Sequence, residues 1–559
     1  MKKIISIIVF SILLFTFQFS VSQTTAIYRY QIRFTDKNNN PFSISLPQEY
    51  LSQKAIDRRE KQHLLIDSLD LPVTPAYIDS VKNTGVIVLY SSKWLNSVTI
   101  FTTDSLALVH INSFSFVKSI KAVGKILPHQ NNSPQYFNSS LRTECGIDNY
   151  YGFAFDQIKQ VHGQALHEKG FKGQGMLIAY LDAGFQHVDL IPAFDSLRKR
   201  NGIIATHDFI TGGDSVYEDN SHGAYCLSIV AGNEPGYYVG TAPNADFVLI
   251  RTEYASTEFP IEEINWAAGA EFADSIGADV ITSSLGYSTF DTVFSGGNTI
   301  IFDHTFLDMD GKTNPSSIAA NIASTRGLIV CNSAGNSGGE SSWRFITAPS
   351  DADNILTVGA IDSSNNYALF SGHGPTFDGR IKPDVVGRGV STWYINTSYG
   401  SASEGNGTSF SCPLIAGLTA CLWEAHPDKS NLEIMNAIRR SASKYFRPDN
   451  NIGYGIPNFA YADLLLSGFN EQSLLSLDSI IVYPTIFSGE IKINLKLNVA
   501  EEISIQLFDL SGRLVDEECA NAYIGFNELS FQPANLTAGV YMLKVIAGNK
   551  IHYEKLVKI

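Results

Sequence analysis

Four short segments of this 559-residue chain contain the residue types that nucleophilic acyl transfer requires. That reaction needs a hydroxyl on a tight turn, an imidazole that accepts its proton, a carboxylate that fixes the imidazole tautomer, and donors for the developing oxyanion. One candidate exists for each part, and each stands after an apolar run or opens a helical run. In chain order they are Asp182, His222, Asn336 and Ser409.

The local sequence favours a defined position for each candidate. Asp182 follows the apolar run 176–181, where a buried carboxylate must find donors or a cationic partner. His222 precedes an apolar helical run that ends at Gly232. Ser409 follows glycines that permit a sharp turn, and it opens a helix whose N-terminus supplies amide donors and a favourable dipole.

Any one of these motifs alone is weak, because a lone Asp or a Gly-Thr-Ser turn is ordinarily a cap. The order Asp, His, Ser differs from that of chymotrypsin and of the α/β-hydrolases. The Gly-x-Ser-x-Gly match at 335–339 opens no apolar helix, which disfavours an α/β-hydrolase elbow. The Asp-Ala-Gly at 182–184 has no second copy, which disfavours an aspartic protease.

The elements that must position these residues lie between about 150 and 465, where apolar runs alternate with helical segments and Gly-rich turns. Near-continuous apolar strands between helices predict an α/β fold with a parallel sheet covered by helices on both faces. Active sites of such sheets lie at the carboxyl ends of the strands. The expected strands are 176–181, 246–250, 278–282 and 327–331.

The two ends of the chain have different patterns. Residues 1–22, with two early lysines, an apolar run of about 16 residues and small residues at 20–22, are typical of a secretory signal. That run is short for a membrane span of about 20 residues, so we expect no transmembrane segment in the mature chain. Residues 23–127 predict a small α+β unit, with strands near 28–34 and 86–90 and helical charge spacing at 52–66.

Beyond this unit, residues 128–150 and 467–478 are expected to be linkers around a catalytic domain at 151–466. The period becomes two in residues 479–559, which predicts a small β-sandwich.

Composition limits the partners. Lys and Arg number 40 against 55 Asp and Glu, a formal charge of −15, which argues against nucleic acid or anionic membrane as the main partner. Six scattered cysteines, with no C-x-x-C, exclude a zinc ribbon or a thioredoxin-like motif and leave disulfide pairing open. Cys226 and Cys412 lie one turn from His222 and Ser409, so we expect small buried side chains there. The histidines at 187, 207 and 373 are expected in solvated loops.

Residues about 160–465 resemble the subtilisin-like serine proteases, or subtilases. The matching segments are Asp182–Gly184, His222–Gly223, Gly240–Asn244, Ser284–Gly286, Ser333–Asn336 and Gly407–Pro413. The resemblance implies peptide-bond hydrolysis through an acyl-enzyme: Ser409 as nucleophile, His222 as general acid and base, Asp182 orienting the imidazole, and Asn336 donating to the oxyanion with the Ser409 amide. It also implies that the substrate is bound by Ser284, Leu285, Gly286 and Thr408, the first three pairing with an extended peptide.

The chain departs from the usual subtilase pattern at several positions. Ala183 stands where Thr or Ser is usual, Ala224 where Thr is usual, and Ser411-Cys412 replaces a small Ala-Ser pair. Residues 386–389 replace an Ala-Pro-Gly segment. None of these changes removes a catalytic atom, so they concern rate and pocket shape, whose walls we expect from the loops 285–300 and 336–347.

The flanking units carry resemblances of their own. Residues 27–125 look like the subtilase pro-region that serves as folding aid and intramolecular inhibitor, which implies a zymogen. Residues 479–559 resemble the C-terminal sorting domain of type IX secretion in Bacteroidetes; the matching segments are Tyr483–Phe487, Leu507–Arg513, Leu536–Tyr541 and Lys555–Ile559. This implies export through the periplasm to the outer surface or the medium by the secretion machinery. The alternative is a plain accessory β-sandwich.

The sequence therefore predicts a secreted serine endopeptidase that acts on proteins or peptides. The alternative is a catalytically silent or autoprocessing-only subtilase fold used as a surface binding module. No cofactor or metal is required for the expected chemistry. Asp308-Met-Asp310-Gly311 is similar to the start of a calcium loop but lacks its remaining ligands, so structural calcium stays open and a turn before a helix near Ser316 is expected.

Overall fold

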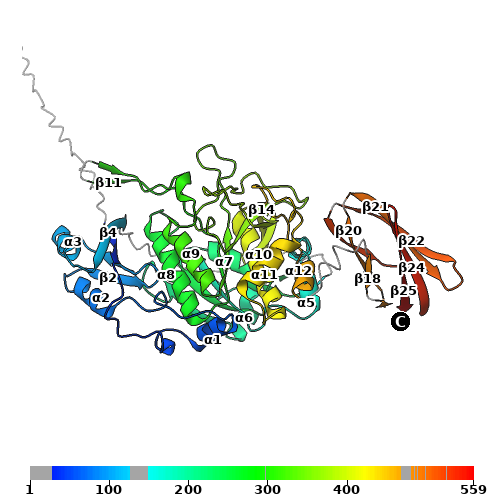
Figure 1. The fold of residues 1–559 in the computed structure, drawn as a ribbon, viewed down its shortest axis with the longest axis horizontal. Coiled ribbons are helices and arrows are strands. Elements are labelled where there is room, and N and C mark those ends of the chain that lie inside the picture. Colours follow the sequence, from blue (N-terminus) through cyan, green and yellow to red (C-terminus); the bar gives the residue numbers. More distant parts are fainter. Residues whose placement is uncertain are drawn as a thin grey trace, which may run out of the picture.

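The computed structural model describes residues 28–125, 149–295, 298–467 and 480–559, apart from 484, 488, 498, 524 and 535. The expected signal at 1–22 and most of the two expected linkers lie outside this part of the chain. Figure 1 shows a large central α/β unit, an N-terminal unit in blue and a C-terminal unit of strands in orange and red.

The central unit is built on a seven-stranded sheet in the order β15-β14-β13-β10-β5-β9-β6, and every neighbouring pair is parallel. This confirms the parallel sheet predicted from the apolar runs. Its strands are β5 (Leu177–Asp182), β6 (Ile203–Asp208), β9 (Asp246–Arg251), β10 (Val280–Ser283), β13 (Ile329–Ser333), β14 (Leu356–Ile361) and β15 (Val385–Arg388).

Helices cover both faces of this sheet (Figure 1). Along β5, Ile178 and Tyr180 pack into one core with residues of α7 (His222–Ala231) and α10 (Thr408–Ala425). The alternate residues, such as Ala179, pack into a second core with α8 (Ile261–Ile276) and α9 (Pro315–Thr325). Because successive side chains of a strand point to opposite faces, the apolar run from Leu177 to Leu181 of β5 buries both faces.

The remaining elements of the central unit are short helices and hairpins at its periphery. The helices are α4 (Phe155–Lys159), α5 (Gln164–Glu168), α6 (Asp195–Lys199), α11 (Asn431–Ser441) and α12 (Phe459–Leu466). The hairpins are β7 (Asn233–Glu234) with β8 (Tyr238–Val239), β11 (Val293–Ser295) with β12 (Asn298–Ile300), and β16 (Thr392–Asn396) with β17 (Ser401–Gly405).

Two expectations about polar residues of the central unit are tested by the fold. Asp310 accepts hydrogen bonds from the backbone N–H groups of Lys312 and Thr313, forming the expected turn before α9. The expectation of a solvated His187 was wrong: its side chain is buried, with Nδ1 3.0 Å from the carbonyl oxygen of Thr397. His207 is partly buried within β6 rather than in a loop.

The N-terminal unit is a four-stranded antiparallel sheet, and its helices 75–82 and 105–112 pack into one core with the sheet. The strand order is β2-β3-β1-β4. Its elements are β1 (Arg29–Phe34), α1 (Gln53–Lys61), α2 (Pro75–Lys82), β2 (Ile87–Ser92), β3 (Ser97–Phe101), α3 (Ser105–Asn112) and β4 (Val117–Gly124). Ser52 caps α1 by accepting a hydrogen bond from the Ala55 amide, and the helix ends at Lys61, before the predicted limit at residue 66.

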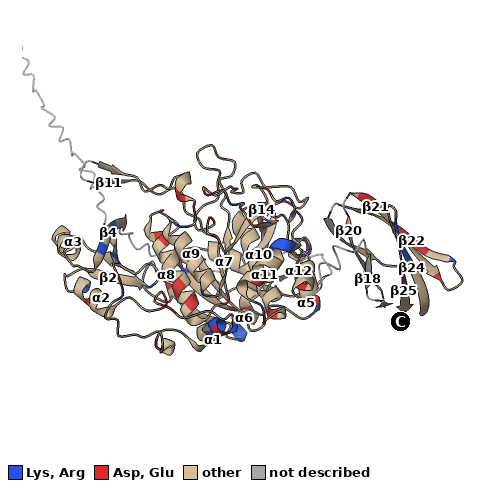
Figure 2. Ribbon diagram, in the orientation of Figure 1, with Lys and Arg blue, Asp and Glu red and all other residues tan. Residues whose placement is uncertain are grey.

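A buried ion cluster joins the N-terminal unit to α8. Asp274 of α8 is fully buried, and Arg58, Arg59 and Lys93 of the N-terminal unit all pair with its carboxylate. Figure 2 shows the basic residues of α1 in blue and the acidic residues of α8 in red. Burial raises the pKa of Asp274, but the three cations outweigh burial and hold that pKa well below its usual range.

This cluster predicts that removing either of two cations of α1 reduces the free energy of unfolding by different amounts. Arg59 also pairs with the buried Asp70 at 2.6 Å, so Arg59→Ala in the full-length chain removes the close partner of Asp70 and one of the three cations around Asp274. It should reduce the free energy of unfolding by about 3–5 kcal/mol. Lys54→Ala removes a pair with Asp279 that is 41% exposed on the lysine side, and should cost below about 1 kcal/mol. Denaturant unfolding measures both. Equal losses of unfolding free energy in the two variants would contradict the larger contribution expected from the buried cluster.

The C-terminal unit consists of two sheets around one shared core, which matches the predicted β-sandwich. The sheets have the orders β18-β20-β23 and β19-β25-β24-β21-β22. Ile491, Ile493, Leu495 and Leu497 are all buried, as the period of two predicts. The strands are β18 (Ile481–Tyr483), β19 (Ile486–Phe487), β20 (Ile491–Leu497), β21 (Glu501–Asp509), β22 (Leu514–Ala522), β23 (Gly525–Phe531), β24 (Gly539–Ala547) and β25 (Lys550–Lys558).

Among the residues that the structure describes, no helix has both the length and the apolar character needed to cross a membrane. The five described cysteines are all free thiols: those at 226, 331, 412 and 421 are buried, and the one at 519 is exposed.

Candidate active site

The sheet and its helices bring the four candidate residues together. Asp182 is the last residue of β5, His222 is the first of α7, and Ser409 is the second of α10. Asn336 follows β13 by three residues. His222, Asn336 and Ser409 line one cavity of about 710 Å³ at the carboxyl edge of the sheet.

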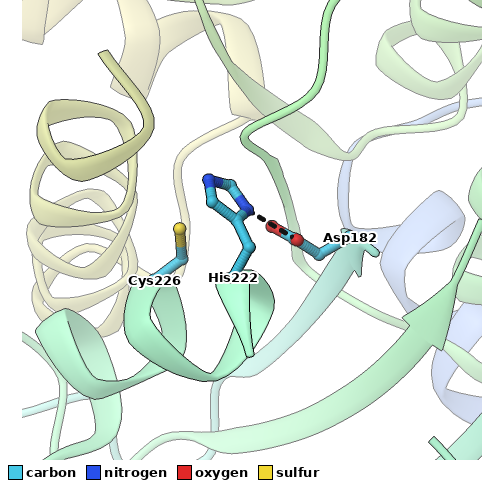
Figure 3. A group of neighbouring side chains, drawn as sticks. All are labelled: Asp182, His222 and Cys226. Atoms are coloured by element: carbon cyan, nitrogen blue, oxygen red, sulfur yellow. Dashed lines mark hydrogen bonds and ion pairs between the residues drawn. The ribbon is translucent and has the colours of Figure 1, made fainter. Parts of the chain in front are cut away.

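A hydrogen bond joins the carboxylate to the imidazole (Figure 3). Asp182 Oδ1 lies 2.8 Å from His222 Nδ1 and also accepts a hydrogen bond from the Ala183 amide at 2.7 Å. Asp182 is fully buried, whereas the His222 side chain is 36% exposed. Because a carboxylate can only accept, Nδ1 carries a proton, which leaves Nε2 of the neutral ring as an acceptor.

The carboxylate also sets the protonation equilibrium of the ring. Burial lowers the pKa of His222, but the charge and the hydrogen bond of Asp182 raise it, and the net pKa is above the usual value for histidine. The other Asp182 oxygen, Oδ2, is buried and accepts no hydrogen bond from the described residues. Its charge is therefore available to stabilise an imidazolium.

The close approach of α7 to the end of β5 requires a glycine after the histidine. A Cβ at Gly223 would lie 2.6 Å from the carbonyl oxygen of Gly184 and 2.8 Å from Cβ of Asp182. Both contacts are too short for a side chain, so Gly223 lets His222 sit directly above the carboxylate.

The nucleophile candidate lies at the N-terminus of α10 and its backbone is fixed by two neighbours. The Ser409 carbonyl oxygen accepts hydrogen bonds from Cys226 Sγ at 3.2 Å and from Ser284 Oγ at 3.0 Å. Its own hydroxyl donates to the Ser284 carbonyl at 3.4 Å, which is a long bond.

Cys226 is the third member of the group drawn in Figure 3 and lies one turn after His222 on α7. It forms with Asp182 and His222 a group whose ligating atoms all lie within 4.8 Å of one another. Burial, followed by the nearby Asp182 charge, raises the pKa of its thiol well above the usual value. The protonated thiol donates to Ser409 and ties α7 to α10, which agrees with the expected small buried side chain.

Asn336 is oriented by the residue that precedes the nucleophile. Asn336 Oδ1 accepts two hydrogen bonds from Thr408, one from the backbone amide at 2.8 Å and one from the side-chain hydroxyl at 3.0 Å. With Oδ1 held in this way, the Nδ2 group is the donor left to face the cavity. Thr408 is fully buried and is not among the residues that line the cavity, and its amide and hydroxyl hold Asn336. Its contact with substrate stays a prediction.

The segment Ser284–Gly286 lines the same cavity, as the sequence predicts for a substrate-pairing segment. It continues β10, which ends at Ser283, and Gly286 is exposed. The cavity wall includes residues of 284–291 and 333–337, together with Thr347, which agrees in part with the expected loops.

Sequence reasoning missed one wall of the cavity. Glu253, Ala255 and Glu258, which follow β9, line it, as does Asn220 before α7. The signal was available in principle, because β9 is parallel to β5 and its carboxyl end lies at the same edge of the sheet.

The chain matches three family models, one for each unit of the fold. Residues 173–455 match the subtilase family, residues 29–138 match the peptidase S8 propeptide domain of Bacteroidota, and residues 481–559 match the secretion system C-terminal sorting domain. The subtilase match covers the parallel α/β unit that holds the candidate site. The chain belongs to the subtilase family of serine proteases, and its sorting domain indicates export to the cell surface or beyond.

Similar proteins carry names that agree with this family. The chain is 29% identical to the serine protease AprX of Bacillus subtilis over 312 residues, 51% of this chain and 64% of AprX. It is 30% identical to subtilisin Savinase of Lederbergia lenta over 305 residues, 54% of this chain and 95% of Savinase.

Among solved structures, the epidermin leader peptide processing serine protease (EpiP) of Staphylococcus aureus superimposes with a TM-score of 0.52 and 16% identity. The superposition covers 78% of this chain and 99% of EpiP, and it supports the fold.

The geometry predicts how the pKa of His222 depends on Asp182. In Asp182→Asn the charge is removed while the burial remains, so the pKa of His222 should fall below the usual histidine value of about 6.5. Titration of the His222 ring by NMR measures this change. Asp428→Asn, which neutralises an exposed carboxylate three residues beyond the end of α10, is the matched control. An unchanged His222 pKa in Asp182→Asn would contradict the electrostatic role of Asp182.

Proposed function

We propose that this protein is a secreted serine endopeptidase that hydrolyses peptide bonds through an acyl-enzyme. The observation that carries the proposal is the buried Asp182–His222 hydrogen bond at the wall of a cavity that Ser409 and Asn336 also line. These side chains supply a carboxylate, a neutral imidazole, a hydroxyl and an amide donor, and the proposed chemistry uses the chain's own groups.

In the proposed acylation step, the substrate lies extended along Ser284–Gly286. Ser409 turns its hydroxyl from the Ser284 carbonyl toward His222 Nε2, which accepts the proton as Oγ attacks the carbonyl carbon. Asp182 stabilises the imidazolium that forms. The imidazolium then returns the proton to the leaving amine, and the carbon–nitrogen bond breaks to give the acyl-enzyme.

The negative charge that develops on the substrate oxygen would be stabilised by two donors. One is Nδ2 of Asn336, and the other is the backbone N–H of Ser409 at the N-terminus of α10. Hydrolysis of the acyl-enzyme follows the same steps. Water replaces the Ser409 hydroxyl as the nucleophile, and His222 again acts as the base.

The N-terminal unit is proposed to act as an intramolecular inhibitor of this site. Its strand β4 ends at Gly124, which packs against Phe259 and Ile261. Phe259 is adjacent in sequence to Glu258, which lines the cavity. The chain that leaves β4 therefore starts beside the cleft, as expected of a segment that occupies it before activation.

Replacement of the nucleophile tests the proposal. Ser409→Ala should reduce kcat by the order of 10⁶, the size of the loss known for subtilisin, and should abolish labelling by a fluorophosphonate. Ser411→Ala, which removes a buried hydroxyl two residues later, should keep the labelling. Circular dichroism checks that both variants fold. Labelling that persists in Ser409→Ala would refute the assignment, and a folded mature wild-type enzyme, freed of its N-terminal unit, that cleaves no peptide would favour a binding module.

The oxyanion donor gives a second test. Asn336→Ala should reduce kcat by about 10²–10³ with little change in KM, because the lost hydrogen bond forms mainly in the transition state. Steady-state kinetics on a peptide amide measures both constants. A change confined to KM would assign Asn336 to ground-state binding instead.

A further inference from the structure

One arm of the cleft is acidic. Glu253, Glu258 and Asp291 line the cavity together with the segment that follows Gly286. Glu258 and Asp291 lie on paired segments, since the Asp291 amide donates to the Glu258 carbonyl at 2.8 Å and the Glu258 amide donates to Asp291 Oδ2 at 3.2 Å. Three carboxylates from two loops therefore gather at one end of the cleft.

No lysine or arginine is among the described residues that line this cavity. The side-chain partner of Glu253 is a neutral group, the Tyr287 hydroxyl, at 3.3 Å. Burial and then the Asp182 charge raise the pKa of Glu253 to about 7. Burial and then the Glu253 charge raise the pKa of Glu258 to about 9. The acidic arm thus holds carboxyl groups with no lysine or arginine beside them among the described residues that line the cavity.

A second feature of the cavity points to a polar ligand. Thr347 lines it, is 6% exposed, and its Oγ1 has no hydrogen-bond partner among the described residues. This hydroxyl lies between the two peptide segments that border the cleft, because a Cβ added at Gly286 or at Gly335 would lie 2.1 or 3.1 Å from it. A buried hydroxyl without a partner is costly unless a ligand supplies one.

The N-terminal unit indicates which side of a bound peptide meets the acidic arm. The chain leaves β4 at Gly124, against Phe259, and Lys125 Nζ lies 5.5 Å from the centre of the Phe259 ring. Phe259 adjoins Glu258. A peptide that ran from the position of Lys125 along the acidic arm toward Ser409 would place residues upstream of its scissile bond in the arm.

We propose that the acidic arm formed by Glu253, Glu258 and Asp291 selects peptides with lysine or arginine on the amino-terminal side of the scissile bond. The inference rests on the proposed proteolytic function and names its substrate class. A cationic side chain placed in the arm favours the ionised form of these carboxyl groups and pairs with it, in surroundings where charge pairs are weakly screened.

The test uses the mature wild-type enzyme and matched peptide amides that carry Lys, Gln or Glu at each position upstream of one scissile bond. At the best position, kcat/KM for the Lys peptide should exceed that for the Gln peptide by about tenfold or more, and the Glu peptide should be cleaved most slowly. Equal kcat/KM values for the three peptides at every upstream position would overturn the proposal, while cleavage itself would leave the proteolytic function intact.

Variants assign the preference to the arm. The double variant Glu253→Gln/Glu258→Gln, and separately Asp291→Asn, should reduce the Lys-to-Gln ratio of kcat/KM, the double variant to within about twofold of unity. Asp428→Asn, an exposed carboxylate outside the cavity, should keep the wild-type ratio. A lysine preference that survives in the double variant would overturn the assignment to these carboxylates.

Discussion

The hydrogen bond between Asp182 and His222 is the interaction on which the rest of the site depends. A fully buried carboxylate must be compensated, and here a backbone amide and an imidazole compensate it. In return the carboxylate fixes the ring tautomer and raises the pKa of the ring above its usual value. The parallel sheet makes this possible, because it ends β5 at the same edge at which α7 and α10 begin.

The surrounding contacts hold the two helices in register with that carboxylate. Gly223 permits α7 to approach β5, and the Cys226 thiol bonds to the Ser409 carbonyl across the gap between α7 and α10. Thr408 holds the Asn336 amide, so the donor for the oxyanion is tied to the turn that presents the nucleophile. Gly223, Cys226 and Thr408 therefore restrict the directions in which the candidate catalytic side chains can point.

Much of this arrangement could be predicted from the sequence, because near-continuous apolar strands such as β5 have a pattern that only a covered parallel sheet explains. The residues Asp182, His222 and Ser409 could be found since each marks the end of a strand or the start of a helix. The loop walls were predicted only in part: residues of the expected loops 285–300 and 336–347 line the cavity, whereas Glu253 and Glu258 after β9 were missed. The buried orientation of Thr408 depends on its tertiary partner Asn336, which no local pattern reveals.

A structure of the wild-type chain after reaction with a peptidyl phosphonate tests the central claim most directly. The account predicts a covalent bond to Ser409 Oγ, a phosphonyl oxygen within hydrogen-bond distance of Asn336 Nδ2 and the Ser409 amide, and His222 still bonded to Asp182. An adduct on another residue, or a Ser409 adduct whose oxygen points away from Asn336, would contradict it.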